Sequence, residues 1–303
     1  MIRNMLAAVL VIALAMTAGA FDIRTYDVLY TGDTGATLDA GGFGIQGSFL
    51  YFSADKYYDR DGESQEWGEG TTFSGTWVPV KISYGIMDGF EVGVTPMFVM
   101  NKQENGPPLN TEYEGTGIAD TWIWAKYGIL PDPMMTARLG VKVPTGVDEM
   151  DADPDELPTG SGQMDIDAAV MFGAPAGPGS LDGSIGYRYR MDRTGDEDAR
   201  EGDYTPGNEI HFYAGYNYFL SDVMSLRLGA GGFFGSDPEE DGEPIPVGMT
   251  GTYVVGSNLV SINPGFDYIM DSGMSLGFDM YYPLMGTNIN AGWGLGLSVG
   301  WGN

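Results

Sequence analysis

Charged side chains recur at alternate positions within otherwise apolar stretches of this chain. In residues 134–144 these are Arg138 and Lys142, and in residues 180–192 they are Arg188 and Arg190. A period of two places such residues on one face of a β-strand and their apolar neighbours on the other. Positive and negative groups on facing strands could form ion pairs across a narrow interior, or line a path for a solute. The polar faces together carry Asp120, Lys126, Arg138, Lys142, Asp165, Asp167, Arg188, Arg190, Glu209, His211, Arg227 and Asp279.

His211 is the one residue of the chain suited to acid–base chemistry near neutral pH. It alternates with Ile210 and Phe212, so it shares the polar face with Glu209. A lipid hydrolase with a single histidine would also need a serine nucleophile in a matched geometry, and no serine has a recognisable partner. We therefore interpret His211 as a hydrogen-bonding residue and predict no catalytic site.

Acidic residues concentrate between the alternating stretches. The segments 54–71, 102–116, 145–161, 193–206 and 236–257 contain 25 of the 42 Asp and Glu residues. We interpret them as solvated loops. A sharper hypothesis is Ca²⁺ binding by Asp151, Asp153 and Asp155, since carboxylate oxygens suit this ion. The stretch lacks the spacing of an EF-hand, so the signal is weak, and no other metal site or cofactor is predicted.

The strands that must position the polar faces occupy residues 41–303. Short connections with turn residues alternate with the long acidic ones, and both chain ends should lie on the same side, which requires an even strand count. We therefore assign 246–256 to a loop, or to one long strand reaching residue 270. The sequence predicts an all-β fold, a transmembrane antiparallel up-and-down β-barrel of about 12 strands with short periplasmic turns and long acidic extracellular loops. The strands are expected near 42–53, 72–85, 89–101, 117–130, 134–144, 162–174, 180–192, 207–220, 224–235, 258–270, 274–285 and 289–302.

The last strand shows the pattern in its plainest form. Every second residue from Ile289 to Trp301 is apolar, with tryptophan near both ends, and the other face is mostly glycine. Such a strand suits a lipid-facing surface with aromatic girdles. It should pair with the first strand, near 42–53, so that no edge faces lipid. With so little bulk on its inner face, this sector is where we expect room in the lumen.

The N-terminus predicts export. Residues 1–20 form a signal peptide, with one arginine, the apolar run Met5–Met16 and a small-residue cleavage site after Ala20. Residues 21–40 are expected to form a tail or a plug. The apolar run is too short for a membrane-spanning helix. The chain has no cysteine, which excludes a lipoprotein anchor, disulfides and thiolate metal sites, and its net charge of −28 argues against nucleic-acid binding.

Several segments resemble one family in the same order along residues 75–300. They are Gly117–Asp120 leading to Lys126–Gly128, Arg138–Gly146, Gly160–Asp165 and Tyr282–Gly286. The arrangement is similar to the outer-membrane proteins of the phenol-degradation meta-pathway family, whose members are commonly described as transporters. The resemblance implies a membrane barrel and uptake of hydrophobic or aromatic solutes. It supplies no site residues.

The main hypothesis is a monomeric barrel in the outer membrane of a Gram-negative bacterium, surrounded by lipid, that passes small solutes of the hydrophobic or aromatic kind without a cofactor. Transport would be passive diffusion, because no ATP-binding motif or energy-coupling segment is visible. A closed barrel with a structural or surface-binding role is the alternative. An outer-membrane lipid hydrolase is a weaker third hypothesis.

Overall fold

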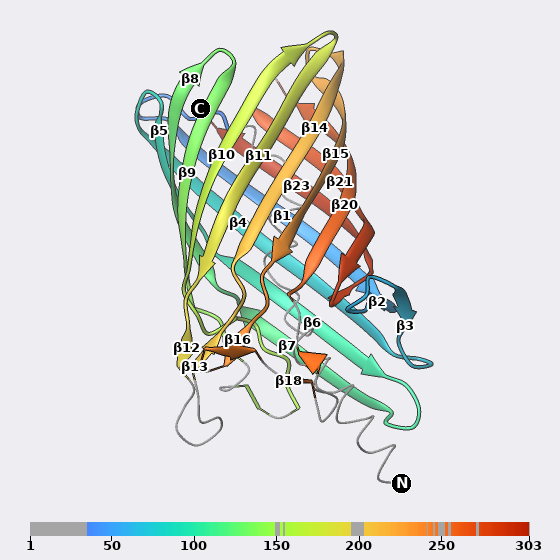
Figure 1. Ribbon diagram of the computed structural model, residues 1–303. Helices are drawn as coiled ribbons and strands as arrows, with labels where there is room; N and C mark the ends of the chain where they lie inside the picture. The colour runs from blue at the N-terminus through green and yellow to red at the C-terminus, as the bar shows by residue number, and fades with distance from the viewer. Residues whose placement is uncertain are drawn as a thin grey trace.

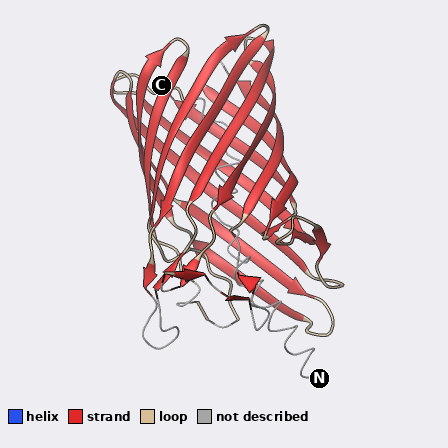
Figure 2. Cartoon of the chain, in the orientation of Figure 1, coloured by secondary structure: helices blue, strands red, loops and turns tan. Residues whose placement is uncertain are grey.

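The computed structural model describes residues 35–148, 152–153, 155–194, 203–240, 242–244, 246–247, 252–253, 256–270 and 273–302. The regular structure of this part is entirely β (Figure 2). It contains no helix long and apolar enough to cross a membrane. The signal peptide and residues 21–34 of the N-terminal segment lie outside the described residues.

Twelve antiparallel strand positions form a closed barrel (Figure 1). Closure comes from β1, which pairs with β4 on one side and with the last strand, β23, on the other. Two positions are split by a short interruption, β5 from β6 and β7 from β8. The strands are β1 (Phe43–Ala54), β4 (Thr72–Met87), β5 (Phe90–Thr95) with β6 (Met97–Asn105), β7 (Thr111–Ile118) with β8 (Thr121–Pro131), β9 (Met134–Val143), β10 (Asp165–Ala176), β11 (Gly179–Arg190), β14 (Glu209–Ser221), β15 (Met224–Gly235), β20 (Asn258–Ile269), β21 (Met274–Thr287) and β23 (Trp293–Gly302).

The two ends of the barrel differ. Tight connections, such as that between β8 and β9, lie at the end drawn uppermost in Figure 1, which we call the turn end. Longer connections lie at the opposite loop end and add small sheets. One contains β2 (Lys56–Tyr58), β3 (Ser64–Glu66) and β22 (Ile289–Asn290), and the others contain β12 (Arg193–Thr194), β13 (Asp203–Thr205), β16 (Glu239–Glu240), β17 (Glu243–Pro244), β18 (Pro246–Val247) and β19 (Thr252–Tyr253).

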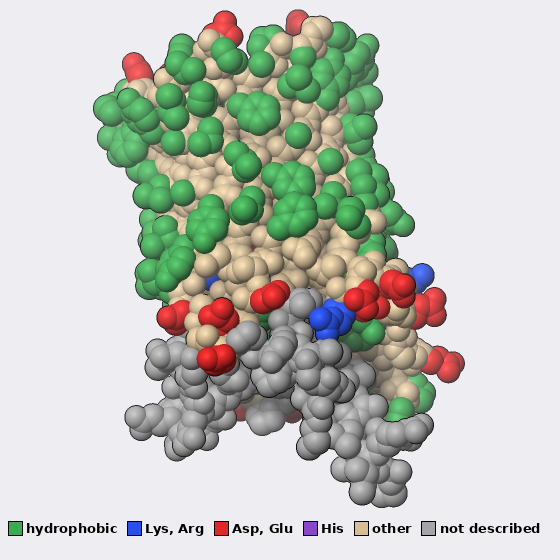
Figure 3. Space-filling view, in the orientation of Figure 1, with side chains coloured by type: hydrophobic (Ala, Val, Ile, Leu, Met, Phe, Trp, Pro, Cys, Tyr) green, Lys and Arg blue, Asp and Glu red, His purple; other side chains and the backbone are tan. Residues whose placement is uncertain are grey.

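Apolar side chains form a belt around the outside of the barrel (Figure 3). Leu139, Ile185, Leu228 and Leu297 are each more than half exposed, as are many others of the same strand parity. In water such a surface would be a large unfavourable patch, whereas in a bilayer it is solvated by lipid. The belt therefore marks the membrane-spanning part, and the acidic side chains visible in Figure 3 gather mainly toward the loop end.

The segment 102–116 is shorter as a loop than the sequence suggests. β6 continues to Asn105 and β7 begins at Thr111, so the two form a hairpin that extends beyond the adjoining wall. Lys102 links the two strands of the hairpin at an exposed site, with its amine 3.0 Å from carboxylate oxygens of both Glu104 and Glu112. The acids therefore belong to paired strands and not to a free loop.

The glycine face of β23 is covered by its neighbours. A Cβ added at Gly296 would lie 2.9 Å from Leu50, and one added at Gly294 would lie 3.5 Å from the Cβ of Tyr281. These glycines therefore accommodate side chains from β1 and β21. The predicted spare room in this sector is taken up by Leu50 and Tyr281, because bulk missing from one strand is filled from the strands beside it.

The outer edge of β7 has no neighbouring barrel strand in the described residues, and the segment 156–161 covers it instead. Leu157 donates its backbone N–H to Glu114 O at 3.0 Å, and Thr159 Oγ1 donates to Ile118 O at 3.0 Å. A Cβ added at Gly117 would lie 3.9 Å from the Cβ of Thr159. The segment thus replaces a strand as the partner of this edge.

This placement predicts that Gly117→Cys with Thr159→Cys forms a disulfide, because the Cβ separation falls in the range that disulfides adopt. The chain has no native cysteine to compete. Oxidation of the folded protein should give a cross-linked species by non-reducing electrophoresis after limited proteolysis between the two positions. The control pair is Gly47→Cys with Thr159→Cys, since an added Cβ at Gly47 meets nothing within 4 Å. Equal cross-linking of both pairs would contradict the placement.

Candidate functional site: the barrel lumen

The structure places the charged candidates on the inner face, most of them buried. Asp120, Lys126, Lys142, Asp165, Asp167, Arg188 and Glu209 are each at most 2 % exposed. Arg190, His211 and Arg227 are also buried, while the side chains of Arg138 and Asp279 are 23 % and 17 % exposed. Asp120 lies just before β8. The other eleven residues fall on alternate positions of β8, β9, β10, β11, β14, β15 and β21. Their role in solute passage stays a prediction.

Ion pairs connect most of these side chains across neighbouring strands. The carboxylate of Asp167 on β10 forms ion pairs with two arginines. Its oxygens lie 2.9 Å from the guanidinium of Arg138 on β9 and 3.6 Å from that of Arg188 on β11. Lys142 lies 2.7 Å from Asp165 and 3.6 Å from Asp120. A charge removed from water at this depth is strongly unfavourable unless it is paired. The network therefore behaves as one electrostatic unit.

His211 belongs to this network. Its Nε2 lies 2.7 Å from Asp167 Oδ2, and its ring lies against the backbone of Gly186. Two serines, Ser275 and Ser298, stand in G-x-S-x-G spacing, but within β21 and β23 and not at a strand-to-helix turn. No serine of the described residues forms a hydrogen bond with the histidine ring. In this geometry His211 is a hydrogen-bonding partner of Asp167.

A second group of charges lies near the turn end of β15, β20 and β21. Arg227 pairs with Asp279 and lies 3.6 Å from Asp267. Asp182 on β11 accepts a hydrogen bond from Asn217 on β14. This group sets one buried cation against three carboxylates, so acidic side chains outnumber basic ones in the interior near the turn end.

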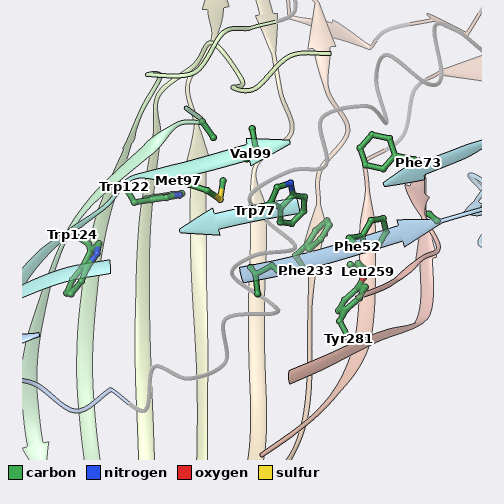
Figure 4. Packing of buried hydrophobic residues seen from close by; sticks show 13 residues of the cluster. Phe52, Phe73, Trp77, Met97, Val99, Trp122, Trp124, Phe233, Leu259 and Tyr281 are labelled. Atoms are coloured by element: carbon green, nitrogen blue, oxygen red, sulfur yellow. The ribbon is translucent and has the colours of Figure 1, made fainter. Parts of the chain in front are cut away.

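The other part of the lumen is apolar. We call it the aromatic sector, and Figure 4 shows how its side chains converge from opposite parts of the wall. Phe233 and Phe52 are 0 % and 1 % exposed, and the rings of Phe52 and Tyr281 are 6.2 Å apart. Its members are Leu50, Phe52, Ala54, Phe73, Trp77, Met97, Val99, Ala119, Trp122, Trp124, Phe233, Leu259 and Tyr281.

Glycines on neighbouring strands make space for two of the large rings. A Cβ at Gly93 would overlap the ring of Trp124, and one at Gly140 would lie 3.3 Å from the ring of Trp122. The guanidinium of Arg188 lies over the Trp122 ring at 4.9 Å, so that ring is held between an arginine and a bare stretch of backbone. Trp122 thereby connects the charged network to the aromatic sector.

Part of the N-terminal segment enters the lumen from the turn end. Ala40 donates its N–H to Asp88, and Leu38 donates to Glu91 Oε2 at 3.0 Å. Further in, Lys126 Nζ donates to Ala36 O at 2.8 Å, and Thr136 donates to the carbonyl of Gly35. The exposed turn residue Asp88 and the buried side chains of Glu91, Lys126 and Thr136 thus supply partners for the backbone of residues 35–40.

The candidate Ca²⁺ site is only partly described. Asp151 lies outside the described residues, while Asp153 and Asp155 lie within them. In the described part of the chain, no group of three or more acidic or histidine side chains is arranged to hold a metal ion. The structure therefore adds nothing in favour of Ca²⁺ binding.

Sequence reasoning missed two features of the lumen. Glu91, 3 % exposed, pairs with Lys126 at 3.5 Å, and its alternation with outward Phe90 and Val92 was a usable signal. The inward aromatics were missed because apolar residues are expected on the lipid face. Trp122 and Trp124 share the parity of Lys126, which was a candidate, so that signal was also present.

The match to known proteins agrees with this architecture. Residues 39–299 match the family described as "Putative MetA-pathway of phenol degradation". The chain belongs to this family. The resemblance seen in the sequence is thus confirmed, and the phenol-degradation family model covers almost all of the described barrel.

Solved structures share the barrel of this phenol-degradation family member. An outer membrane channel from Pseudomonas putida F1 gives a TM-score of 0.71 at 14 % identity, covering 90 % of this chain and 98 % of the other. The translocator domain of the autotransporter NalP from Neisseria meningitidis gives 0.53 at 14 % identity, covering 94 % and 96 %. No curated protein matches in sequence. Fold, apolar belt and family together identify a β-barrel of the outer membrane.

The ion network predicts a large effect of neutralising its centre. Asp167→Asn keeps the shape of the side chain but leaves Arg138 and Arg188 without their shared carboxylate. We expect the free energy of unfolding to fall by about 3–5 kcal/mol, as for other broken buried ion pairs. Urea titration of the protein folded in lipid vesicles measures this loss.

Lys102→Ala is the matched control, because it also removes several ion pairs but at an exposed site. It should leave the unfolding midpoint nearly unchanged. Equal midpoints for the two variants would show that the buried network contributes little.

Proposed function

We propose that this protein is a passive outer-membrane channel for small hydrophobic or aromatic solutes. The supporting observation is the aromatic sector, because the interior of membrane barrels is ordinarily polar. Inward Phe52, Trp77, Phe233 and Tyr281 offer apolar contact that a channel for ions or sugars does not need. Family membership and the likeness to a channel from Pseudomonas putida F1 agree with this role.

The charged network complements this surface by fixing the wall opposite to it. Its carboxylates and cations are mutually paired, so it presents little net charge to a passing solute. Along this wall a neutral molecule would then be favoured over an ion of either sign. The proposal needs no enzyme chemistry, and His211 is engaged with Asp167 in the network.

Selective uptake tests the proposal. In liposome swelling, phenyl glucoside should enter faster than glucose, although it is larger, because its ring can contact the aromatic sector. Phe52→Asn should reduce that preference about tenfold, equivalent to about 1.4 kcal/mol of lost apolar contact. Phe49→Asn is the control, since Phe49 is on the same strand but faces lipid.

If neither sugar enters and planar bilayers show no conductance, the barrel is closed. The alternative of a structural or surface-binding barrel would then stand, with the ion pairs and aromatic side chains serving as lumen filling. Lipase activity of the folded protein that is lost in His211→Ala would instead support the hydrolase hypothesis.

We also propose that the N-terminal segment, residues 21–40, narrows the lumen as a plug. The hydrogen bonds of Leu38 and Ala36 with Glu91 and Lys126 support this role. Deleting residues 21–38 should raise single-channel conductance several-fold, because backbone held in the lumen is removed. Glu91→Gln weakens the attachment of the segment without removing it, because Glu91 holds Leu38 and pairs with Lys126. This variant should raise only the frequency of openings to the larger conductance of the deletion variant. Unchanged conductance in the deletion variant would rule the plug out.

A further inference from the structure

The three inward tryptophans of the aromatic sector differ in their hydrogen bonding. Trp77 Nε1 donates to Asn101 Oδ1 at 3.1 Å, and Trp124 Nε1 donates to Thr95 Oγ1 at 3.1 Å. Trp122 Nε1 has no acceptor among the described residues, although the side chain is only 7 % exposed. A buried donor left without an acceptor costs about 1–3 kcal/mol.

The orientation of Trp122 is fixed by its surroundings. Arg188 lies over the ring at 4.9 Å, and the backbone of Gly140 lies against its far edge. Figure 4 shows the nitrogen-bearing edge pointing away from β8 toward Met97, within the aromatic sector. The ring therefore cannot turn its N–H to the wall without losing both supports.

A second buried donor lies on the other side of the lumen. Asn263 on β20 is 1 % exposed, and its Oδ1 accepts from Ser261, while its Nδ2 has no acceptor among the described residues. Asn263 sits in the stretch of β20 opposite Tyr281, which belongs to the aromatic sector. Both groups lack an acceptor among the described residues, so each N–H is available to an acceptor atom of a molecule that enters the lumen.

The charges near Trp122 restrict that acceptor. Four cations, those of Arg138, Lys142, Arg188 and Arg190, face four carboxylates, those of Asp120, Asp165, Asp167 and Glu209. There is no excess positive charge to hold an anion, so a carboxylate brought here would lose its hydration without gaining a counter-charge. A carbonyl, ether or ester oxygen satisfies the N–H without that penalty.

We propose that the aromatic sector holds a binding site for a neutral aromatic-sized molecule bearing a hydrogen-bond-accepting oxygen, with Trp122 Nε1–H as the donor. The inference rests on the proposed channel function and names the class of solute. The apolar side chains supply affinity, and the indole N–H selects an oxygenated solute over the corresponding hydrocarbon. Trp122 is then a specificity-determining residue.

Indole resonances of the full mature protein in lipid nanodiscs test this site. The chain has six tryptophans, so ¹⁵N-labelled indole gives six signals. The Trp122 signal is assigned from Trp122→Phe, or by elimination from the five other Trp→Phe variants if that variant does not fold. The probes are acetophenone and α-methylstyrene, which share a shape and differ by C=O against C=CH₂, and benzoate as an anionic acceptor.

Acetophenone should shift the Trp122 N–H signal downfield, and α-methylstyrene should not, while the Trp124 signal shows no such difference. Trp122→Phe should weaken acetophenone binding about 2- to 12-fold and leave α-methylstyrene binding unchanged, as expected for one hydrogen bond. Trp124→Phe is the matched control and should treat both probes alike. Benzoate should bind more weakly than acetophenone.

Equal shifts from acetophenone and α-methylstyrene, no shift from either, or tighter binding of benzoate would overturn the inference. The result is separable from the channel proposal. An acceptor-specific shift without solute uptake would leave the site standing and remove transport. Solute uptake without an acceptor-specific shift would support transport and remove the proposed binding site.

Discussion

Backbone hydrogen bonding in a medium without water is the constraint on which this structure depends. Lipid offers no partner for an exposed N–H or C=O, so a sheet in the membrane must have no free edge. Here β1 meets this requirement by pairing with both β4 and β23, in a continuous register from Gly44 with Gly302 to Ser53 with Trp293. Once the wall is closed, each strand has one face to lipid and one to the interior.

That division sorts the side chains by parity, but it does not make the interior uniform. Charged residues concentrate on β8 to β14, where neighbouring strands supply opposite charges, and aromatic residues converge from β1, β4, β6, β8, β15, β20 and β21. Trp122 lies where the two meet, with Arg188 over its ring. The interior therefore combines a rigid electrostatic side with an apolar side.

The alternation of residues was sufficient to predict the closed twelve-strand barrel, because a period of two is set by local geometry. The inward placement of residues such as Lys142 and Asp165 follows from the same period. Their particular partners do not, since these depend on register and rotamers. The aromatic sector was not predicted, because apolar residues of a membrane barrel are expected to face lipid, whereas Trp122 and Phe52 face the interior. The glycines of β23 misled for a related reason: the space they leave is used by Leu50 and Tyr281, on strands that become neighbours only in the folded chain.

The two sides of the interior also differ in when they can form. The network around Asp167 joins β9, β10, β11 and β14, which follow one another along the chain. Its contacts to Arg138 and His211 span only 29 and 44 residues, so they close loops far shorter than the whole barrel. The contact of Phe52 with Tyr281 brings together residues from the two ends of the barrel sequence. An assembly intermediate holding the central strands alone would contain the charged network and lack the apolar surface. The surface suited to a solute thus comes into being in the same step that seals the barrel against lipid.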